Sequence, residues 1–178
     1  MEDRESFSIS PGTNIMDVLG HSGYTFDFAI ADLIDNCIAA HATDIEIFVD
    51  INNEVPYLYI LDNGEGMDLL RLKQAAVIGF KDIEDERDCT DLGRFSTGLK
   101  SAAKSICNNM YISSKVKNHS ANTIQLDFDH IKSEQKWEAF IVHNEELASK
   151  LGEQGTLIFC DRLIIGNELG ASLIYEKM

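Results

Sequence analysis

Hydrophobic and polar positions in the first part of the chain predict a helix followed by two strands. The segment Tyr24–Ala40 places apolar residues every three or four positions, the spacing of one buried helix face. In Ile45–Ile51, apolar residues occupy every second position, as in a strand with one buried face. Pro56 precedes a second strand, Tyr57–Leu61, and a glycine turn then leads to a helix around Asp68–Ile78.

The pattern in the rest of the chain turns from helix to strand. Residues Gly79–Asp91 are charged and aperiodic, which is typical of a long loop, and the turn Gly93–Gly98 opens a helix that continues to about Asn108. A short helix, Asn144–Leu151, has Asn144 as its N-cap. The predicted strands are Met110–Val116, Thr123–Phe128, Lys136–Val142 and Thr156–Cys160. Together these elements predict an α+β fold: a two-layer sandwich of one mixed, mostly antiparallel sheet with helices on one face.

Composition supports a single domain spanning residues 1–178. Hydrophobic residues make up 44% of the chain, enough for one core, and with only two prolines there is no linker-like segment. Asp and Glu total 30 against 15 Lys and Arg, a net charge of −15, which disfavours a free-standing nucleic-acid binder. The apolar stretches Leu163–Ile165 and Ala171–Tyr175 predict more structure than the chain supplies, as if its C-terminus were cut.

The chain ends and the cysteines predict an intracellular protein with no membrane segment. The N-terminus lacks the basic start and apolar stretch of a secretory signal, and no run of about 18 apolar residues exists. The four cysteines form no Cys-x-x-Cys pair, so free thiols in a reducing compartment are expected, with a disulfide as the alternative. The five histidines have no metal-ligand spacing.

Polar residues on the first helix offer the first candidate chemistry. Asp32 and Asn36 lie four positions apart and therefore share one helix face. The carboxylate can accept a proton from water, and the amide oxygen can bind a hard cation such as Mg²⁺. A solvated stripe on a surface helix is the alternative.

Two glycine-containing turns offer further candidates. Asp62 and the turn that includes Gly64 and Gly66 follow a strand directly, so a flat ligand could approach the backbone while the carboxylate accepts a hydrogen bond from an exocyclic amine. The turn Gly93–Gly98 opens a helix, and its N–H groups and dipole favour an anion. An ordinary strand-to-helix turn and an ordinary loop-to-helix junction are the respective alternatives.

The order and spacing of these motifs resemble the ATPases of the gyrase, heat-shock chaperone, histidine kinase and MutL (GHKL) superfamily. The resemblance runs from about Tyr24 to Cys160. The segment Phe28–Ala40, and Gly79-Phe80-Lys81 ahead of Gly93-Arg94-Phe95, look most like the MORC-type branch. The resemblance implies the Bergerat fold, with ATP between the helices and a lid loop.

The resemblance also implies a role for each matched residue. Asp32 falls on the general base and Asn36 on the Mg²⁺ ligand, while Asp62 matches the carboxylate that reads the adenine amine. The remaining matches are Ala40 against the adenine, Gly64, Gly66 and Met67 in the pocket wall, Lys81 at the base of the lid, Gly93, Arg94, Phe95, Ser96, Thr97, Gly98 and Leu99 in the lid and phosphate turn, Lys100 as a basic residue of the MORC-type pattern, and Thr156 of Gly155-Thr156 in the adenine network.

Three departures from the family pattern bear on activity. Asp32 is one methylene shorter than the usual Glu, a shift of about 1.5 Å, and misplacing a base can cost on the order of 100-fold in rate. Ser96 stands where many relatives have Gly. The family's downstream transducer domain, which supplies a Lys to the terminal phosphate, has no room in 178 residues. The resemblance therefore implies that this domain is the N-terminal module of a longer protein.

The sequence therefore predicts Mg-dependent ATP binding and slow hydrolysis, coupled to lid closure and to ATP-dependent homodimerisation of the full-length protein. Nucleic acid is expected to be contacted only through other domains. Alternatives are a non-hydrolysing ATP-dependent switch, a phosphotransferase of histidine-kinase type, and an interaction domain without nucleotide.

Overall fold

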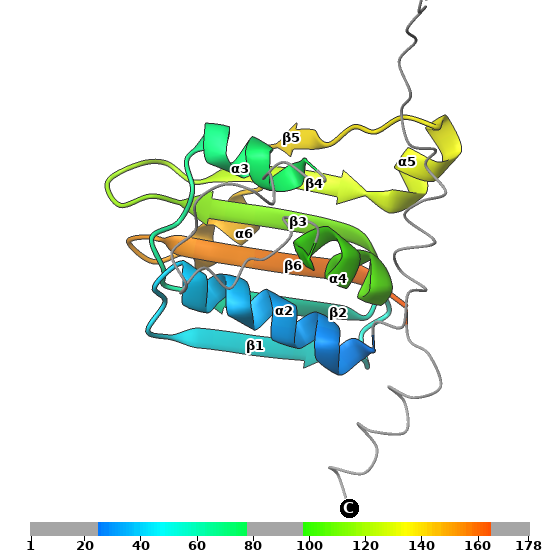
Figure 1. The fold of residues 1–178 in the computed structure, drawn as a ribbon, viewed down its shortest axis with the longest axis horizontal. Coiled ribbons are helices and arrows are strands. Elements are labelled where there is room, and N and C mark those ends of the chain that lie inside the picture. The colour runs from blue at the N-terminus through cyan, green and yellow to red at the C-terminus, as the bar shows by residue number, and fades with distance from the viewer. Residues whose placement is uncertain (1–24, 78–97, 165–178) are drawn as a thin grey trace, which may run out of the picture.

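The computed structural model describes residues 25–77 and 98–164, and its core is one six-stranded sheet with helices packed against it (Figure 1). The α+β sandwich predicted from the sequence is confirmed. In chain order the elements are α2 (Phe26–Ala39), β1 (Ile45–Asp50), β2 (Tyr57–Asp62), α3 (Leu69–Ala76), α4 (Gly98–Ile106), β3 (Cys107–Lys115), β4 (Asn122–Asp127), α5 (Phe128–Glu134), β5 (Phe140–Val142), α6 (Glu145–Lys150) and β6 (Gly155–Leu163).

The sheet has the strand order β1-β2-β6-β3-β4-β5. All five pairings are antiparallel, whereas the expected sheet was mixed and mostly antiparallel. The pairs β1–β2, β3–β4 and β4–β5 each join two strands that follow one another in the sequence. β6 then enters between β2 and β3 and runs opposite to both, so it closes two separate parts into one sheet.

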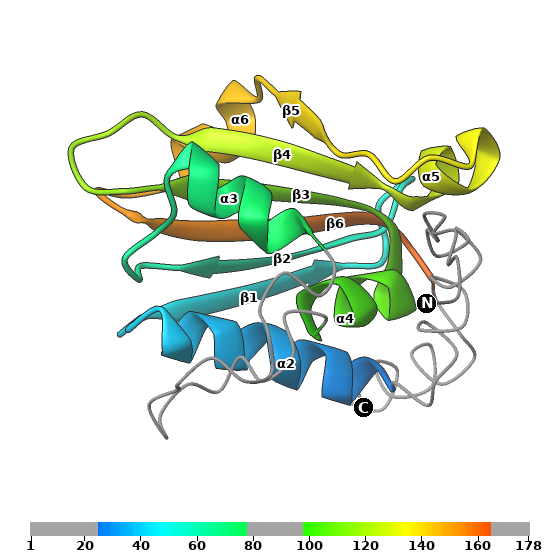
Figure 2. The same cartoon turned by 45° about the horizontal axis from the view of Figure 1, so that its top comes forward.

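One face of the sheet carries the main hydrophobic core, beneath α2, α3 and α4 (Figures 1 and 2). The helix α2 buries Ala29, Leu33 and Cys37, which lie four residues apart, so the predicted helical spacing is confirmed. The other large, fully buried side chains of this core are Leu58, Ile60, Leu72, Met110, Ile112, Ile124, Cys107 and Cys160. This core fixes the axis of α2 over the sheet.

The opposite face is covered in part by α6, so helices lie on both faces and not on one as expected (Figure 1). Leu147 and Leu151 pack there on Leu157 of β6. Tyr59 and Phe159 lie beside this cluster, and the rings of Phe48, Tyr57, Tyr59, Tyr111 and Phe159 contact one another in pairs along the sheet.

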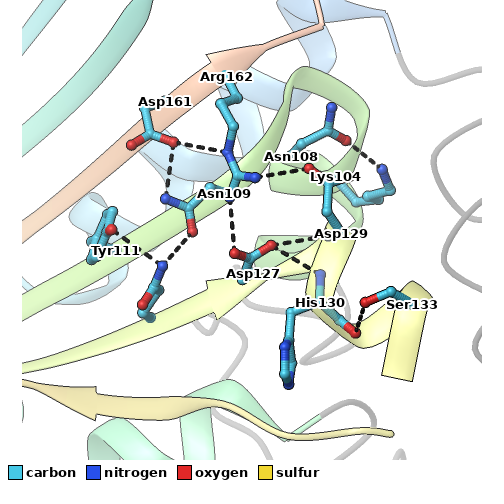
Figure 3. A network of polar contacts seen from close by, with 11 residues as sticks. Lys104, Asn108, Asn109, Tyr111, Asp127, Asp129, His130, Ser133, Asp161 and Arg162 are labelled. Carbon is cyan, nitrogen blue, oxygen red and sulfur yellow. Dashed lines mark hydrogen bonds and ion pairs between the residues drawn. The ribbon is translucent and has the colours of Figure 1, made fainter. Parts of the chain in front are cut away.

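The region after β4 differs from the expected strands. The predicted strand Lys136–Val142 is short, with β5 covering only Phe140–Val142, and the helix α5 was not predicted. Asp127 caps α5 by accepting hydrogen bonds from the N–H groups of Asp129 and His130, both at 3.1 Å (Figure 3). Phe128 and Ile131, three residues apart, are buried, so two apolar side chains and one cap fold a segment too short to show a helical period.

Candidate functional site

The candidate site begins on α2, where Asp32 and Asn36 lie one turn apart and are half-buried. Asn36 Nδ2 donates a hydrogen bond to the backbone oxygen of Asp32 at 2.9 Å. This bond uses the amide nitrogen and fixes the side-chain orientation, which leaves Oδ1 as the acceptor that can bind a cation. The helix is therefore a scaffold that presents one carboxylate and one amide oxygen on the same face.

Asp62 ends β2 and is 6% exposed. Its Oδ1 accepts hydrogen bonds from the backbone N–H groups of Gly64, at 2.8 Å, and Thr156, at 3.2 Å. Burial raises the pKa of the Asp62 carboxyl, and the two backbone hydrogen bonds and the Cys37 thiol oppose that rise. No ion pair with a Lys, Arg or His is found for Asp62 among the described residues. A buried carboxylate held by neutral donors is a strong acceptor for a ligand amine.

Cys37, which sequence reasoning did not assign to the site, connects α2 to this carboxylate. Its Sγ donates to the backbone oxygen of Leu33 at 3.3 Å, and its side chain also lies within hydrogen-bonding range of Asp62. Burial, followed by the charge of Asp62, raises the pKa of the Cys37 thiol to about 12. The thiol therefore stays protonated, and its single hydrogen can point either to the Leu33 backbone oxygen or to Asp62.

Two glycines allow the strand ends to meet at Asp62. Gly66 has φ of 69°, and a Cβ there would lie 2.0 Å from the backbone oxygen of Lys115. Gly155 has φ of 133°, and its Cβ would lie 2.0 Å from the backbone oxygen of Asp62. Both positions require glycine, because the backbone conformation and the close approach exclude a side chain. Gly155 belongs to the site for this reason and was not predicted to contact Asp62.

Ser114 is a further site residue that the sequence did not reveal. Its side chain is fully buried, and its Oγ lies 2.8 Å from Thr156 Oγ1 and accepts a hydrogen bond from the backbone N–H of Met67 at 2.8 Å. The predicted residues Thr156 and Met67 are thereby joined through one hydroxyl. The available signal was a serine in a strand of otherwise largely apolar inward positions, but it does not say which turn the hydroxyl contacts.

The turn after Asp62 is also tied to the end of α2. Asn63 Oδ1 accepts hydrogen bonds from the N–H groups of Thr43, at 2.9 Å, and Asp44, at 3.0 Å. The backbone oxygen of Ala40 accepts one from Glu65 N at 2.9 Å. The structure therefore brings Ala40, Asp62 and the turn containing Gly64 together.

Comparison with known proteins identifies the family. The family model described as "Histidine kinase-, DNA gyrase B-, and HSP90-like ATPase" matches residues 24–156, well over half of the chain. The chain belongs to this family. The GHKL resemblance read from the motifs is thus confirmed, and the domain is one of an ATP-binding ATPase family.

Two curated relatives are MORC proteins. The chain is similar to "ATPase MORC2B" of Mus musculus, with 33% identity over 93 residues, which are 51% of this chain and 9% of the relative. It is also similar to "ATPase morc-1" of Caenorhabditis elegans, with 40% identity over 76 residues, 42% of this chain and 8% of that protein. Both matches support the MORC-like assignment within the GHKL family, and the chain spans less than a tenth of either relative.

Part of the expected GHKL site lies outside the described residues. This holds for Lys81, Gly93, Arg94, Phe95, Ser96 and Thr97. Gly98, Leu99 and Lys100 form the first turn of α4, so the predicted helix after the second glycine turn is confirmed. Contacts from these residues to a phosphate stay a prediction.

The donor set on α2 fits the magnesium ion that the GHKL family implies. Mg²⁺ prefers carboxylate and amide oxygens, and it usually keeps waters and substrate phosphates as its other ligands. Asn36 Oδ1 supplies one such oxygen, and Asp32 stands one turn away. Within residues 25–77 and 98–164, no group of three or more His, Cys, Asp or Glu side chains could hold a metal ion by itself.

A hollow of about 410 Å³ lies at the end of the Asp62 strand and shares Asp62 and Asn63 with this site. Its charged side chains are mostly acidic, and its one lysine, Lys117, pairs with Glu153 at 3.0 Å. It is lined by Asp44, Glu46, Leu61, Asp62, Asn63, Lys117, Gly152, Glu153 and Gln154. Asp32, Asn36, Met67 and Thr156 are not among these residues, and the acidic lining disfavours a phosphate.

No helix among the described residues is long and apolar enough to cross a membrane. The cysteines Cys37, Cys107 and Cys160 are free and buried, as the sequence analysis expected of a reduced protein. Cys89 lies outside the described residues.

Proposed function

We propose that this domain binds Mg-ATP and hydrolyses it slowly. The observation that carries the proposal is the buried carboxylate of Asp62, which is hydrogen-bonded to the N–H groups of Gly64 and Thr156 and lacks a cationic partner among the described residues. Such an acceptor favours the exocyclic amine of adenine, since the amine donates a hydrogen bond and brings no charge. The same carboxylate would repel the oxygen that guanine carries at that position.

The α2 residues are proposed to act on the phosphate end of the nucleotide. Asn36 Oδ1 would hold Mg²⁺, and the ion would supply positive charge to offset that of the phosphates. Asp32, on the same helix face, would orient or deprotonate the attacking water. Asn36 Nδ2 is already engaged with the Asp32 backbone at 2.9 Å, so the ligand oxygen needs little reorientation.

The conformational part of the proposal concerns the segment Gly79–Gly98. We propose that it closes over bound ATP and that closure favours a homodimer of the full-length protein, while hydrolysis resets the open state. This part rests on the GHKL resemblance of the motifs, and Gly79–Thr97 lie outside the described residues. Nucleic acid would be contacted only through other domains, because this chain carries a net charge of −15.

Binding is tested by calorimetry with ATP, with and without Mg²⁺. Asp62→Asn is expected to weaken ATP binding by on the order of 100-fold, since its amide group would face the adenine amine with a donor. Asn36→Ala is expected to weaken binding only when Mg²⁺ is present. Asp127→Asn, a carboxylate change far from the site, is the matched control. Undiminished ATP binding by Asp62→Asn would overturn the assignment.

Hydrolysis is tested by substitutions at Asp32, where the short side chain favours a second candidate, a non-hydrolysing ATP switch. Asp32→Asn is expected to abolish phosphate release in the full-length protein while ATP still binds. Asp32→Glu restores the side-chain length usual in the family and is expected to raise the rate, by up to about 100-fold. Phosphate release that is equal in wild type and both variants would favour the switch.

A further inference from the structure

We infer that the face of the sheet opposite the main core is a docking surface for a basic, arginine-bearing segment of a protein partner. The surface consists of a row of aromatic rings across the strands and the acidic hollow beside that row. Because α2 covers the other face of the sheet, the inference does not depend on the proposed ATP site. The charge and the rings of this face identify the chemistry of its occupant.

Four aromatic side chains form the aromatic row across four neighbouring strands. Phe48 of β1 pairs directly with Tyr59 of β2, which pairs with Phe159 of β6. Phe159 pairs in turn with Tyr111 of β3. The helix α6 covers the side of this row at Leu157 (Figure 1), whereas Phe48, on the edge strand, is 41% exposed. A large aromatic surface that stays open at one end is typical of an interaction site.

Carboxylates flank the open end of the aromatic row. Glu46 and Asp50 lie two residues before and after Phe48, so the three side chains project from the same face of β1. Neither carboxylate forms an ion pair with a Lys, Arg or His of the described residues. A guanidinium on the Phe48 ring would therefore meet a carboxylate on either side. Arginine suits this arrangement, because its planar group stacks on aromatic rings and donates paired hydrogen bonds to carboxylates.

The acidic hollow continues this surface beyond Glu46. Glu46 lines the hollow of about 410 Å³ and also accepts a hydrogen bond from the Tyr59 hydroxyl, so one side chain joins the hollow to the aromatic row. The charged side chains that line the hollow are four carboxyl groups and one lysine, and that lysine, Lys117, is paired with Glu153. The hollow therefore attracts a second cationic side chain of the same segment.

A cation of the chain itself already lies on the aromatic row. Lys150 Nζ, on α6, is 5.1 Å from the centroid of the Tyr59 ring. A cation over an aromatic ring is attracted by the negative charge of the ring face. The aromatic row thus binds an ammonium within the chain, and Phe48 at its open end offers the same chemistry to a partner.

The charge of the face selects among the possible occupants. A single nucleic-acid strand could stack its bases on the rings, but its phosphates would meet Glu46 and Asp50. A second copy of this chain would bring two acidic faces together, and each chain has a net charge of −15. A basic protein segment has the complementary charge and is favoured over both.

The experiment measures the binding of a short capped peptide of alternating glycine and arginine to the full chain, by calorimetry at low salt. A second peptide has citrulline in place of arginine, which keeps the shape of the side chain and removes its charge. The variants are Glu46→Gln and Phe48→Leu, the latter removing the ring while keeping an apolar side chain. Glu134→Gln, at an exposed position of α5, is one control. Ile47→Ala is the other, because Ile47 is 43% exposed and lies on the opposite face of β1.

We expect the arginine peptide to bind about tenfold more tightly than the citrulline peptide and to bind more weakly as salt is added. Glu46→Gln should weaken its binding by about tenfold and Phe48→Leu by about threefold, while both controls bind as the wild type does. Equal binding of the two peptides, or no binding of the arginine peptide, would overturn the inference. Equal losses in Phe48→Leu and Ile47→Ala would also overturn it.

Two further measurements test the other occupants. Binding of oligothymidine that Phe48→Leu weakens would assign the face to nucleic acid and overturn the inference. Dimerisation in sedimentation velocity that Phe48→Leu abolishes would assign it to a second copy, with the same consequence. Urea unfolding shows whether each variant folds, and the comparison of the two peptides on the wild type needs no variant. A wild type that binds the arginine peptide but no ATP would overturn the proposed function and leave this inference standing.

Discussion

Two rows of polar side chains cross the sheet, at opposite ends and on opposite faces, and they stabilise carboxylates in different ways. The row Asp62–Thr156–Ser114 holds its carboxylate with backbone N–H groups and hydroxyls. In the other row, Asp161 is the cross-strand partner of Asn109, and Asn109 that of Asp127. There Arg162 bonds Asp127 at 3.0 Å and Asp129 at 2.8 Å (Figure 3).

The pKa shifts of the two carboxyls have opposite signs. Burial raises the pKa of Asp62, and no cation among the described residues offsets it. Burial also acts on Asp127, but the His130 N–H and the Arg162 guanidinium outweigh it, so the pKa of Asp127 is lowered. A carboxylate with its own cation is already satisfied and stabilises the fold. A carboxylate such as Asp62, whose burial costs stability, is a better candidate for ligand binding.

The largest expected effect lies at the backbone that supports the Asp62 row. Gly155→Ala should destabilise the domain by about 3 kcal/mol or more, because its Cβ would lie 2.0 Å from the Asp62 backbone oxygen at a φ of 133°. Gly152→Ala is the control, since a Cβ there meets nothing within 4 Å. Urea unfolding measures both. Similar stability of the two variants would contradict the claim that position 155 requires glycine for β6 to approach Asp62.

In the row Asp161–Asn109–Asp127, whose Asp127 pairs with Arg162, we expect a smaller loss of stability than for Gly155→Ala and no change in nucleotide binding. Asp127→Ala removes the cap of α5 and the bond to Arg162, and should cost about 2 kcal/mol of unfolding free energy. Urea unfolding and ATP calorimetry on the same sample measure the two quantities. Loss of ATP binding in this folded variant would show that the two rows are coupled and that the comparison is wrong.

The pH dependence of stability should separate the two rows again. The folded-state pKa of Asp127 is lowered, so its contribution is present above the unfolded value of about 3.9 and is lost as pH falls through the folded value. The folded-state pKa of Asp62 is raised, so stability is lost as pH rises from about 3.9 through the folded value. Unfolding from pH 2 to 7 should therefore show a flatter acid loss in Asp127→Asn and a gain near neutrality in Asp62→Asn. Identical pH profiles for both variants would contradict this assignment.

The smallest expected effect concerns Tyr111, which lies beside the row Asp161–Asn109–Asp127 and contacts it through Gln125. Tyr111→Phe removes one acceptor at 3.2 Å from Gln125 Nε2, which keeps its other bond to Asn109 Oδ1 at 2.9 Å. The cost should stay below about 0.5 kcal/mol in thermal unfolding, because the remaining bond satisfies the amide. A loss above about 2 kcal/mol would mean that the row acts as one cooperative network.

The sequence predicted the elements with strong local signals. The spacing of Leu33 and Cys37 defined the buried face of α2, and the glycine turn placed Asp62 at a strand end. It could not predict α5, because Phe128 and Ile131 are too few to show a helical period. It also missed the role of Ser114, since Met67 lies 47 residues away in the chain and meets it only after β6 has joined β3 to β2.

The central position of β6 has a consequence for how the domain folds. The last strand in the described chain pairs with both β2 and β3, and Thr156 bonds Asp62 across 94 residues. Before Gly155 leaves the ribosome, β1–β2 and β3–β4–β5 are separate hairpin and meander units, each with an unpaired inner edge. Such edges are templates for pairing with other chains, and contacts so distant in sequence form slowly. The nascent domain is therefore open to aggregation until β6 inserts, and that same insertion places Thr156 between Asp62 and Ser114.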